Sequence, residues 1–283
     1  MKHYIYTLSL IICLNLNSQE PKQINDSIIP LDEVIIKGNT ILGNKFVAKN
    51  RTGAAYYLST EELAQFDYTD INRALSKISG INFYEEDGFG LRPNISIRGT
   101  SPERSSKIAI MEDGILISPA PYSASSAYYF PSVARMQAIE VLKGSSQIQY
   151  GPYTTGGAIN FVSTEIPQKF RGKISTSYGS FKTGQTHATI GYSSEKFGYM
   201  FEILNYNSDG FKSLNEDLNT GFDINEITSK IKFVPKTTNI DQSFELKFHT
   251  YDEISNETYL GLTETDFQKN PYLRYPGSEK DKM

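Results

Sequence analysis

The chain has 283 residues and a formal net charge of −4, and it contains 19 tyrosines and 16 phenylalanines but no tryptophan. So small a net charge gives no electrostatic reason to expect nucleic acid or another strongly charged partner. The single cysteine, Cys13, lies close to the N-terminus. The chain beyond it therefore has no disulfide, no thiolate metal site and no cysteine nucleophile.

The first residues carry one lysine, an apolar run from Tyr4 to Leu16 and then the polar Asn17-Ser18-Gln19. This order is typical of a secretory signal peptide, and the run is too short for a helix that spans a membrane. Residues 1–19 are therefore predicted to be a signal peptide. No later run approaches the length of a membrane helix, so a membrane role would have to come through β-strands.

A polar leader with two prolines, residues 20–30, precedes a β-branched run. The run is Leu31-Asp32-Glu33-Val34-Ile35-Ile36-Lys37-Gly38, and its composition predicts an extended segment. A strand-forming segment on a flexible tether can pair with the edge of a partner's sheet. The alternative is that this run is the first strand of the domain that follows.

Residues 57–80 predict helices. Ser59 or Thr60 can cap a first turn, and Thr69-Asp70 opens a second segment that Gly80 ends. In that second segment apolar residues recur at helical spacing and are expected to enter a core: Ile71, Ala74, Leu75 and Ile78. Strands are predicted at Asn94–Arg98 and Lys107–Met111. Mixed helices and strands from Asn39 to Pro167 indicate an α+β domain.

Several predicted turns that contain glycine occur toward the end of this domain. The apolar strand Ala138–Leu142 runs into Lys143-Gly144, and a polar link leads to Tyr150-Gly151-Pro152. Gly156-Gly157-Ala158-Ile159-Asn160 then opens a second strand. Glycine at such corners indicates tight backbone turns in which a side chain would clash.

After Pro167 the sequence alternates between apolar and polar residues. In the clearest segments Ile227, Ser229, Ile231 and Phe233 share one face, as do Phe244, Leu246 and Phe248. Weaker alternation occurs at Gly172–Gly179, Thr186–Ser194 and Tyr199–Asn207. Strands of about ten residues with short turns on one side are the pattern of transmembrane β-strands. Most of the charges on the other face are expected to meet water.

No residue pattern predicts an enzyme. Beyond the signal peptide the histidines are His187 and His249, and neither has zinc-ligand spacing. The HExxH, Walker and GxSxG motifs are absent from the sequence. We therefore expect no catalytic residue, no metal site and no cofactor.

Six short segments occur in the order seen in TonB-dependent outer-membrane receptors, which the chain resembles: LDEVIIKG, SIRG, MEDGI, IEVLKG, YGP and GGAIN. The resemblance implies a periplasmic leader at 20–38 that holds the TonB box at 31–38. It further implies an α+β plug domain at 39–167 and, at 168–283, the start of an antiparallel transmembrane β-barrel in the outer membrane of a Gram-negative bacterium. The residues it marks as structural in the plug are Arg98, Gly99, Asp113, Gly114, Lys143, Gly144, Tyr150, Gly151, Gly156, Gly157 and Asn160.

In such receptors a substrate binds between the plug and the extracellular loops, and a TonB-type energy-coupling protein in the periplasm pulls on the TonB box. The resemblance implies active uptake of an iron chelate through a lipid-embedded barrel. Residues 119–122, 148–161 and 259–275 look most like ferric dicitrate receptors. An anionic chelate favours guanidinium and hydroxyl donors. The candidate substrate-binding residues are Arg104, Tyr122, Ser123 and Arg274.

The sequence leaves other functions and other classes of protein open. A receptor for another siderophore, for cobalamin or for an oligosaccharide would share the plug motifs and differ in its loops. A non-transporting outer-membrane β-protein or adhesin, and a secreted enzyme, are alternatives from other classes. About five strands cannot close a barrel, because open sheet edges in lipid leave backbone groups unpaired. The chain is therefore expected to be the front portion of a longer receptor.

Overall fold

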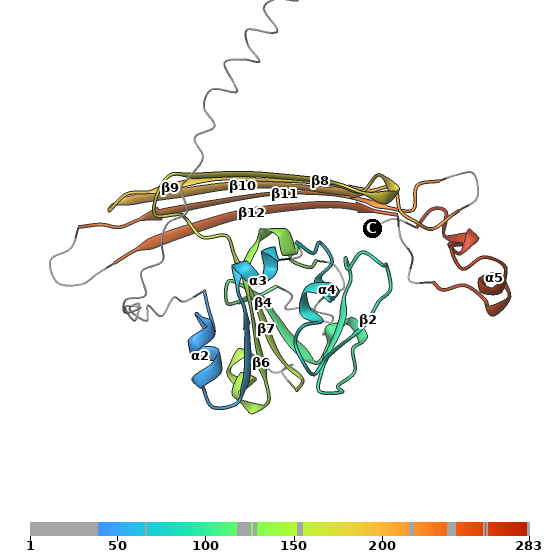
Figure 1. Cartoon of the computed structure of the whole chain (residues 1–283), viewed down its shortest axis with the longest axis horizontal. Helices are drawn as coiled ribbons and strands as arrows, with labels where there is room; N and C mark the ends of the chain where they lie inside the picture. The colour runs from blue at the N-terminus through green and yellow to red at the C-terminus, as the bar shows by residue number, and fades with distance from the viewer. Residues whose placement is uncertain are drawn as a thin grey trace, which may run out of the picture. The chain divides into compact units, whose positions relative to one another are not determined.

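The structure is a computed structural model, and it describes residues 39–65, 67–117, 126, 129–151, 155–214, 218–236, 242–256, 258 and 260–281. The predicted signal peptide, the predicted TonB box, Tyr122 and Ser123 lie outside the described residues. The described residues belong to one compact unit that begins at Ile36. Figure 1 shows their arrangement and labels many of their helices and strands.

The first part of the described chain contains a mixed five-stranded sheet. Its strand order is β1 (Ala54–Leu58), β6 (Met136–Lys143), β7 (Gly157–Ser163), β4 (Ile108–Glu112) and β5 (Ile115–Leu116). Strands β4 and β7 run parallel, and the other neighbours run antiparallel. Strands β2 (Ile81–Tyr84) and β3 (Asn94–Ile97) pair separately. The strands predicted around residues 94–98, 107–111, 138–142 and 156–160 are all present.

Short helices accompany this sheet. They are α2 (Lys45–Asn50), α3 (Thr60–Ala64), α4 (Ile71–Leu75) and the 3₁₀ turns η1 (Glu103–Ser105), η2 (Val133–Arg135) and η3 (Ser145–Tyr150). Ser59 and Glu62 form a capping box at α3, and the Asp70 carboxylate accepts from the Asn72 N–H at α4. The prediction of helix from residue 57 is wrong at its start. Tyr57 and Leu58 lie in β1, because pairing with β6 buries Leu58.

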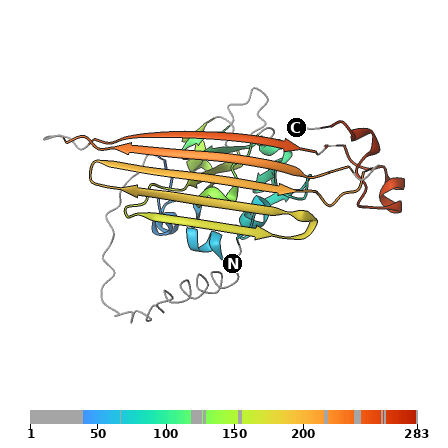
Figure 2. The same ribbon diagram turned by 90° about the horizontal axis from the view of Figure 1, so that it is seen from above.

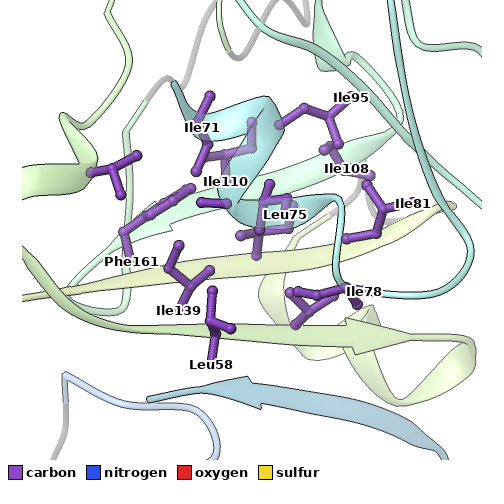
Figure 3. Close-up of a cluster of buried hydrophobic side chains, with 14 of the residues drawn as sticks. Leu58, Ile71, Leu75, Ile78, Ile81, Ile95, Ile108, Ile110, Ile139 and Phe161 are labelled. Atoms are coloured by element: carbon purple, nitrogen blue, oxygen red, sulfur yellow. The ribbon is translucent and has the colours of Figure 1, made fainter. Parts of the chain in front are cut away.

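The apolar core of this domain lies between α4 and the sheet (Figure 3). Ile71 and Leu75 of α4 pack in one cluster with Ile110, Ile139 and Phe161 from three strands. On the other face of the sheet Leu42 and Ala48 pack with a second, smaller group: Ala109, Met111, Leu142 and Ala158. The central strands are thus buried on both faces, which explains why they read as nearly continuous apolar runs.

Two turns of this domain need a left-handed backbone. Arg98 and Gly99 have φ of 56° and 77°, and Asp113 and Gly114 have φ of 51° and 78°. Two consecutive residues with positive φ are typical of type I′ turns, which favour glycine at the second position. Arg98, predicted to end a strand, is therefore a turn residue. Asp113-Gly114 joins β4 to β5.

The second part of the described chain is an antiparallel sheet whose strands follow chain order (Figure 2). They are β8 (Arg171–Tyr178), β9 (Gly184–Ser193), β10 (Phe197–Ser208), β11 (Phe222–Phe233) and β12 (Phe244–Ser255). The predicted domain boundary at Pro167 falls between β7 and β8. The loops carry η4 (Ser180–Lys182), α5 (Glu264–Lys269) and η6 (Pro276–Ser278). None of the helices in the described ranges is long and apolar enough to cross a membrane.

The two faces of this sheet have opposite character, as the alternation predicted. Phe201, Ile227 and Leu246 lie exposed on one face, which we call the outer face. Glu226 and Lys230 lie on the other face and are only 1% exposed. The expectation that the charged face meets water is wrong for these residues, because the first domain covers them.

Candidate functional site

A network of charged side chains joins the first domain to the sheet, and Arg135 lies at its centre. Arg135 has no exposed surface. Its guanidinium pairs with Glu112 of β4, with 3.2 Å between Nη1 and Oε1, and with Glu226 of β11. It also donates to the Tyr129 hydroxyl over 3.0 Å, and that hydroxyl donates to Glu112 over 2.7 Å. The two parts of the chain therefore share one buried cation.

The network fixes the charge states of its members. Burial alone would lower the pKa of Arg135, but the carboxylates of Glu226 and Glu112 outweigh burial and hold this pKa above its usual value. Burial would likewise raise the pKa of Glu112, but the charges of Arg135 and Lys247 outweigh burial and hold it far below its usual range. Arg135 and Glu112 thus stay charged in a dry environment.

Asp113, in the turn after β4, forms a second part of the network. The Lys247 ammonium donates to Glu112 and to Asp113, each over 2.6 Å, and Lys230 lies 3.7 Å from Asp113. The Asp113 carboxylate also accepts from the N–H of Ser163 over 2.9 Å and from its hydroxyl over 2.5 Å. Burial would raise the pKa of Asp113, but Lys230 and Lys247 outweigh burial and lower it. One turn residue therefore connects β7 with two strands of the second sheet.

Both histidines of the described chain lie on the same side of the sheet as this network. The His187 ring Nε2 is 2.9 Å from Glu202, which also accepts from the Thr164 hydroxyl over 2.8 Å. The His249 ring Nδ1 is 2.9 Å from the Thr228 hydroxyl. Within the described ranges no group of three or more His, Cys, Asp or Glu residues is arranged to hold a metal. These histidines and their hydrogen-bond partners belong to the polar contact between the first domain and the sheet.

A cavity of about 830 Å³ lies between the loop that follows β2 and the long loops of the sheet. One part of its wall is aromatic: the Phe89 ring lies 5.5 Å from that of Phe211 and 5.0 Å from that of Phe222. Among its charged residues, Arg92 pairs with Glu253 of β12 over 2.9 Å, and both side chains are 5% exposed. A cavity of this size fits a small-molecule ligand.

The structure brings two of the predicted substrate-binding residues to this cavity. Arg104 pairs with Glu86 over 3.3 Å, and its side chain is 34% exposed. Arg274 is buried and donates to the Ser278 hydroxyl over 2.8 Å and to the carbonyl oxygens of Asn256, Ser278 and Asp281. Arg104 therefore offers its guanidinium to the cavity, whereas Arg274 ties together the loop that forms one wall.

Most of the predicted structural plug residues lie in β6 and β7 or in the segment between these strands. The Lys143 ammonium donates to the Ser79 carbonyl over 2.7 Å, and Gly144 has φ of 105°. A Cβ at Gly157 would lie 2.4 Å from the Leu142 carbonyl oxygen, so only glycine allows this strand spacing. Asn160 is fully buried. These residues build the domain and do not line the cavity.

Apart from Asp113, which it named as a structural residue, the sequence analysis missed the charged network. Its members are Glu112, Tyr129, Arg135, Glu226, Lys230 and Lys247. Two signals were available: Glu112 ends an apolar strand, and Glu226 and Lys230 alternate with apolar residues. Neither signal names a partner, because the partners lie far away along the chain.

Residues 48–158 match the family model of the TonB-dependent receptor plug domain. Among solved structures the chain is similar to the ferric citrate transporter FecA in its unliganded form, with a TM-score of 0.66 and 24% identity, covering 82% of this chain and 36% of that one. It is also similar to the ferric yersiniabactin uptake receptor FyuA from Yersinia pestis, with a TM-score of 0.56 and 19% identity, covering 73% and 32%. A third is the pyoverdine outer membrane receptor FpvA from Pseudomonas aeruginosa, with a TM-score of 0.60 and 16% identity, covering 73% and 28%.

Residues 48–158 thus form a plug domain of the kind found in TonB-dependent receptors. The antiparallel sheet of the chain continues the fold of these receptors, and within the described residues that sheet is open. Across both parts the chain has the fold of the ferric citrate transporter and spans about a third of the length of the solved receptors it matches. The predicted fold class, a plug domain followed by an incomplete antiparallel sheet, is confirmed.

Proposed function

We propose that the chain is the plug-bearing part of an outer-membrane receptor that takes up an iron chelate, in particular ferric citrate, by TonB-dependent transport. The observation that carries this proposal is the polarity of the sheet, which directs buried charges to the plug and apolar side chains outward. Lipid would cover the outer face, and a TonB-type coupling protein would act in the periplasm on Leu31–Lys37. The proposal involves no catalytic step.

The outer face supports a membrane position. On β10 the outward residues Phe197, Tyr199, Phe201 and Ile203 are aromatic or aliphatic, and the next two outward residues are Asn205 and Asn207. The partner strand repeats this division, since Phe233, Ile231 and Ile227 are followed by Asn225 and Asp223. An apolar band next to a polar margin is the expected outer surface of a transmembrane β-strand.

The cavity supports an iron chelate as the cargo. A guanidinium recognises a carboxylate through two parallel N–H donors, which suits citrate. Arg104 is the best-placed donor, because its partner Glu86 is itself 27% exposed and can be replaced by an anionic ligand. Lys212 also lines the cavity. Tyr122 and Ser123 remain proposed hydroxyl donors, and Arg274 is proposed to act by shaping the loop.

Uptake of ferric citrate by the complete receptor tests this proposal, in cells that have no other ferric citrate receptor. Deletion of Leu31–Lys37 should stop uptake and leave ligand binding intact. Normal uptake by the deletion variant would reject TonB coupling and favour an adhesin or another non-transporting protein. Arg104→Ala should weaken uptake at unchanged outer-membrane abundance, and unaltered kinetics would remove Arg104 from the site.

A second candidate cargo follows from the aromatic wall of the cavity. Phe89, Phe211, Phe222, Phe267 and Tyr275 all line it. Aromatic rings pack well against an aryl-bearing iron chelate, whereas citrate has no ring. Phe211→Ala should leave ferric citrate uptake unchanged if citrate is the cargo. A loss of binding confined to aryl chelates in that variant would favour the second candidate.

A further inference from the structure

Glu140 is a fully buried carboxylate in the middle of β6, and three of its hydrogen-bond donors come from the segment that precedes α2. It accepts from the backbone N–H groups of Ile41 over 2.7 Å, Leu42 over 3.0 Å and Gly43 over 2.7 Å. Hydrogen bonds to a charged acceptor are stronger than those to a neutral acceptor, and successive N–H groups that converge on one anion form a compact nest. Glu140 thus holds the segment that precedes α2.

Asn160 of β7 lies directly opposite Glu140 and completes this hold. Its amide nitrogen donates to Glu140 over 2.8 Å and to the Asn39 carbonyl over 3.1 Å. Its amide oxygen accepts from the Gly114 N–H over 2.8 Å. The two side chains therefore tie residues 39–43 to the central strands and to the turn that carries Asp113.

The other contacts of this segment are weaker. Leu42 and Ala48 cover the small apolar cluster on this face of the sheet. Lys45 pairs with Glu62 over 2.8 Å, but its side chain is 50% exposed, and exposed ion pairs contribute little to stability. Beyond α2 the chain enters β1, which in the part of the chain that the structure describes lies at the edge of the sheet and pairs with β6 alone. Among the described contacts, Glu140 is the main polar hold on the start of the plug.

We propose that Glu140 and Asn160 form the anchor through which a pull on the chain before Asn39 first acts on the plug, so that residues 39–43 leave Glu140 before any plug strand separates. The origin of the pull rests on the proposed function, whereas the anchor itself does not. The three N–H bonds share one carboxylate and should break together. A buried carboxylate without its donors is costly, which favours return of the segment when the pull ends.

Hydrogen exchange in the complete receptor tests the anchor without transport. We expect the amides of residues 41–43 to be protected in the wild type and to exchange roughly tenfold faster in Glu140→Gln, because a neutral acceptor binds the N–H groups more weakly. Lys45→Gln, which removes the exposed ion pair of the same segment, should match the wild type. Wild-type exchange rates in Glu140→Gln would overturn the anchor.

Two further measurements cover a Glu140→Gln variant that fails to fold. Asn160→Ala retains Glu140 and its three N–H bonds but removes the bridge to Asn39, so it should give a smaller increase in exchange. In the wild type alone, amides of residues 41–43 that exchange as fast as those of an unfolded peptide would overturn the proposal.

Thiol labelling of an Ile41→Cys variant separates this proposal from the proposed function. The natural cysteine, Cys13, lies in the predicted signal peptide and would be removed with it, so the label reports on position 41. With the coupling protein and the proton gradient present, labelling should increase in the wild type, and in Glu140→Gln it should be high without them. High labelling in Glu140→Gln with no response of the wild type would support the anchor and reject TonB coupling. A coupling-dependent response that Glu140→Gln leaves unaltered would reject the anchor and support the coupling.

Discussion

Alternate residues of strands β8–β12 lie on opposite faces of the sheet, and the two faces have different surroundings. The face toward the plug buries Glu202, Glu226 and Lys230, whereas the outer face exposes large apolar side chains such as Phe201 and Ile231. In a protein surrounded by water, the charged face would be exposed and the apolar face would be buried. The comparison shows that charged and polar side chains make many of the contacts between the plug and the sheet, beside one apolar cluster in which Leu91 packs with Tyr206 and Phe222.

The largest expected effect comes from removing the shared cation of the plug-facing side. Arg135→Met should lower the free energy of unfolding of the complete receptor by about 3–5 kcal/mol, because Glu226 would stay buried without the Arg135 cation and Glu112 would keep only Lys247 as its cationic partner. Denaturant unfolding followed by the loss of plug structure measures this. Lys182→Ala, which removes an exposed ion pair with Asp209, is the control and should cause no measurable change. Equal stability of the two variants would mean that water reaches the network.

A lysine on the outer face tests the other side of the comparison. Phe201→Lys should cost about 2–4 kcal/mol in a lipid bilayer, whereas Asn205→Lys on the same face of β10 should cost only about 0–1 kcal/mol. The folded fraction of the complete receptor in lipid vesicles, measured during denaturant titration, compares the two variants. Similar costs at both positions would contradict a lipid boundary between Phe201 and Asn205.

Removal of one hydroxyl group from either face of the sheet should have a smaller effect on stability. Thr228 is fully buried, and its hydroxyl bonds to His249, so Thr228→Val should cost about 1 kcal/mol. Thr250 is exposed on the outer face of β12, and Thr250→Val should be neutral or slightly stabilising in lipid. Thermal unfolding of both variants provides the measurement. A greater loss for Thr250→Val would reverse the assignment of the faces.

The smallest effect is expected from mild acid. The pKa values of Glu112 and Asp113 are lowered in the folded protein from ordinary values of 4.5 and 3.8. The stability they contribute is therefore fully present above those ordinary values and is lost as the pH falls through the lower, folded values. Stability measured from pH 7 to pH 5 should owe no change to these two groups. If stability fell between pH 7 and pH 5 and Glu112→Gln abolished that fall, Glu112 would bind a proton in this pH range, which would contradict its lowered pKa.

The sequence predicted β3, β4, β6 and β7 of the first domain and the alternating strands of the second sheet, because alternation, apolar runs and glycine turns are local signals. It did not predict β1, β2 or β5. It did not predict the charged network, since Arg135 and Glu226 become neighbours only through the register of two sheets. Glu140 was harder to recognise. Its partners are backbone N–H groups, which no residue type reveals, and its neighbours in the strand are apolar. Arg104 could be proposed because its chemistry, a cation in a turn, can be read directly from the sequence, and its role in substrate binding stays a prediction.

The strand order of the plug also has a consequence for how the chain folds. Leu58 of β1 pairs with Ile139 of β6, so the first strand gains its neighbour only after much of the plug has been made and exported. Contacts between residues so far apart in sequence form slowly, and an unpaired strand is prone to aggregation in the meantime. The N-terminal part of the plug is therefore expected to be the last to settle during biogenesis.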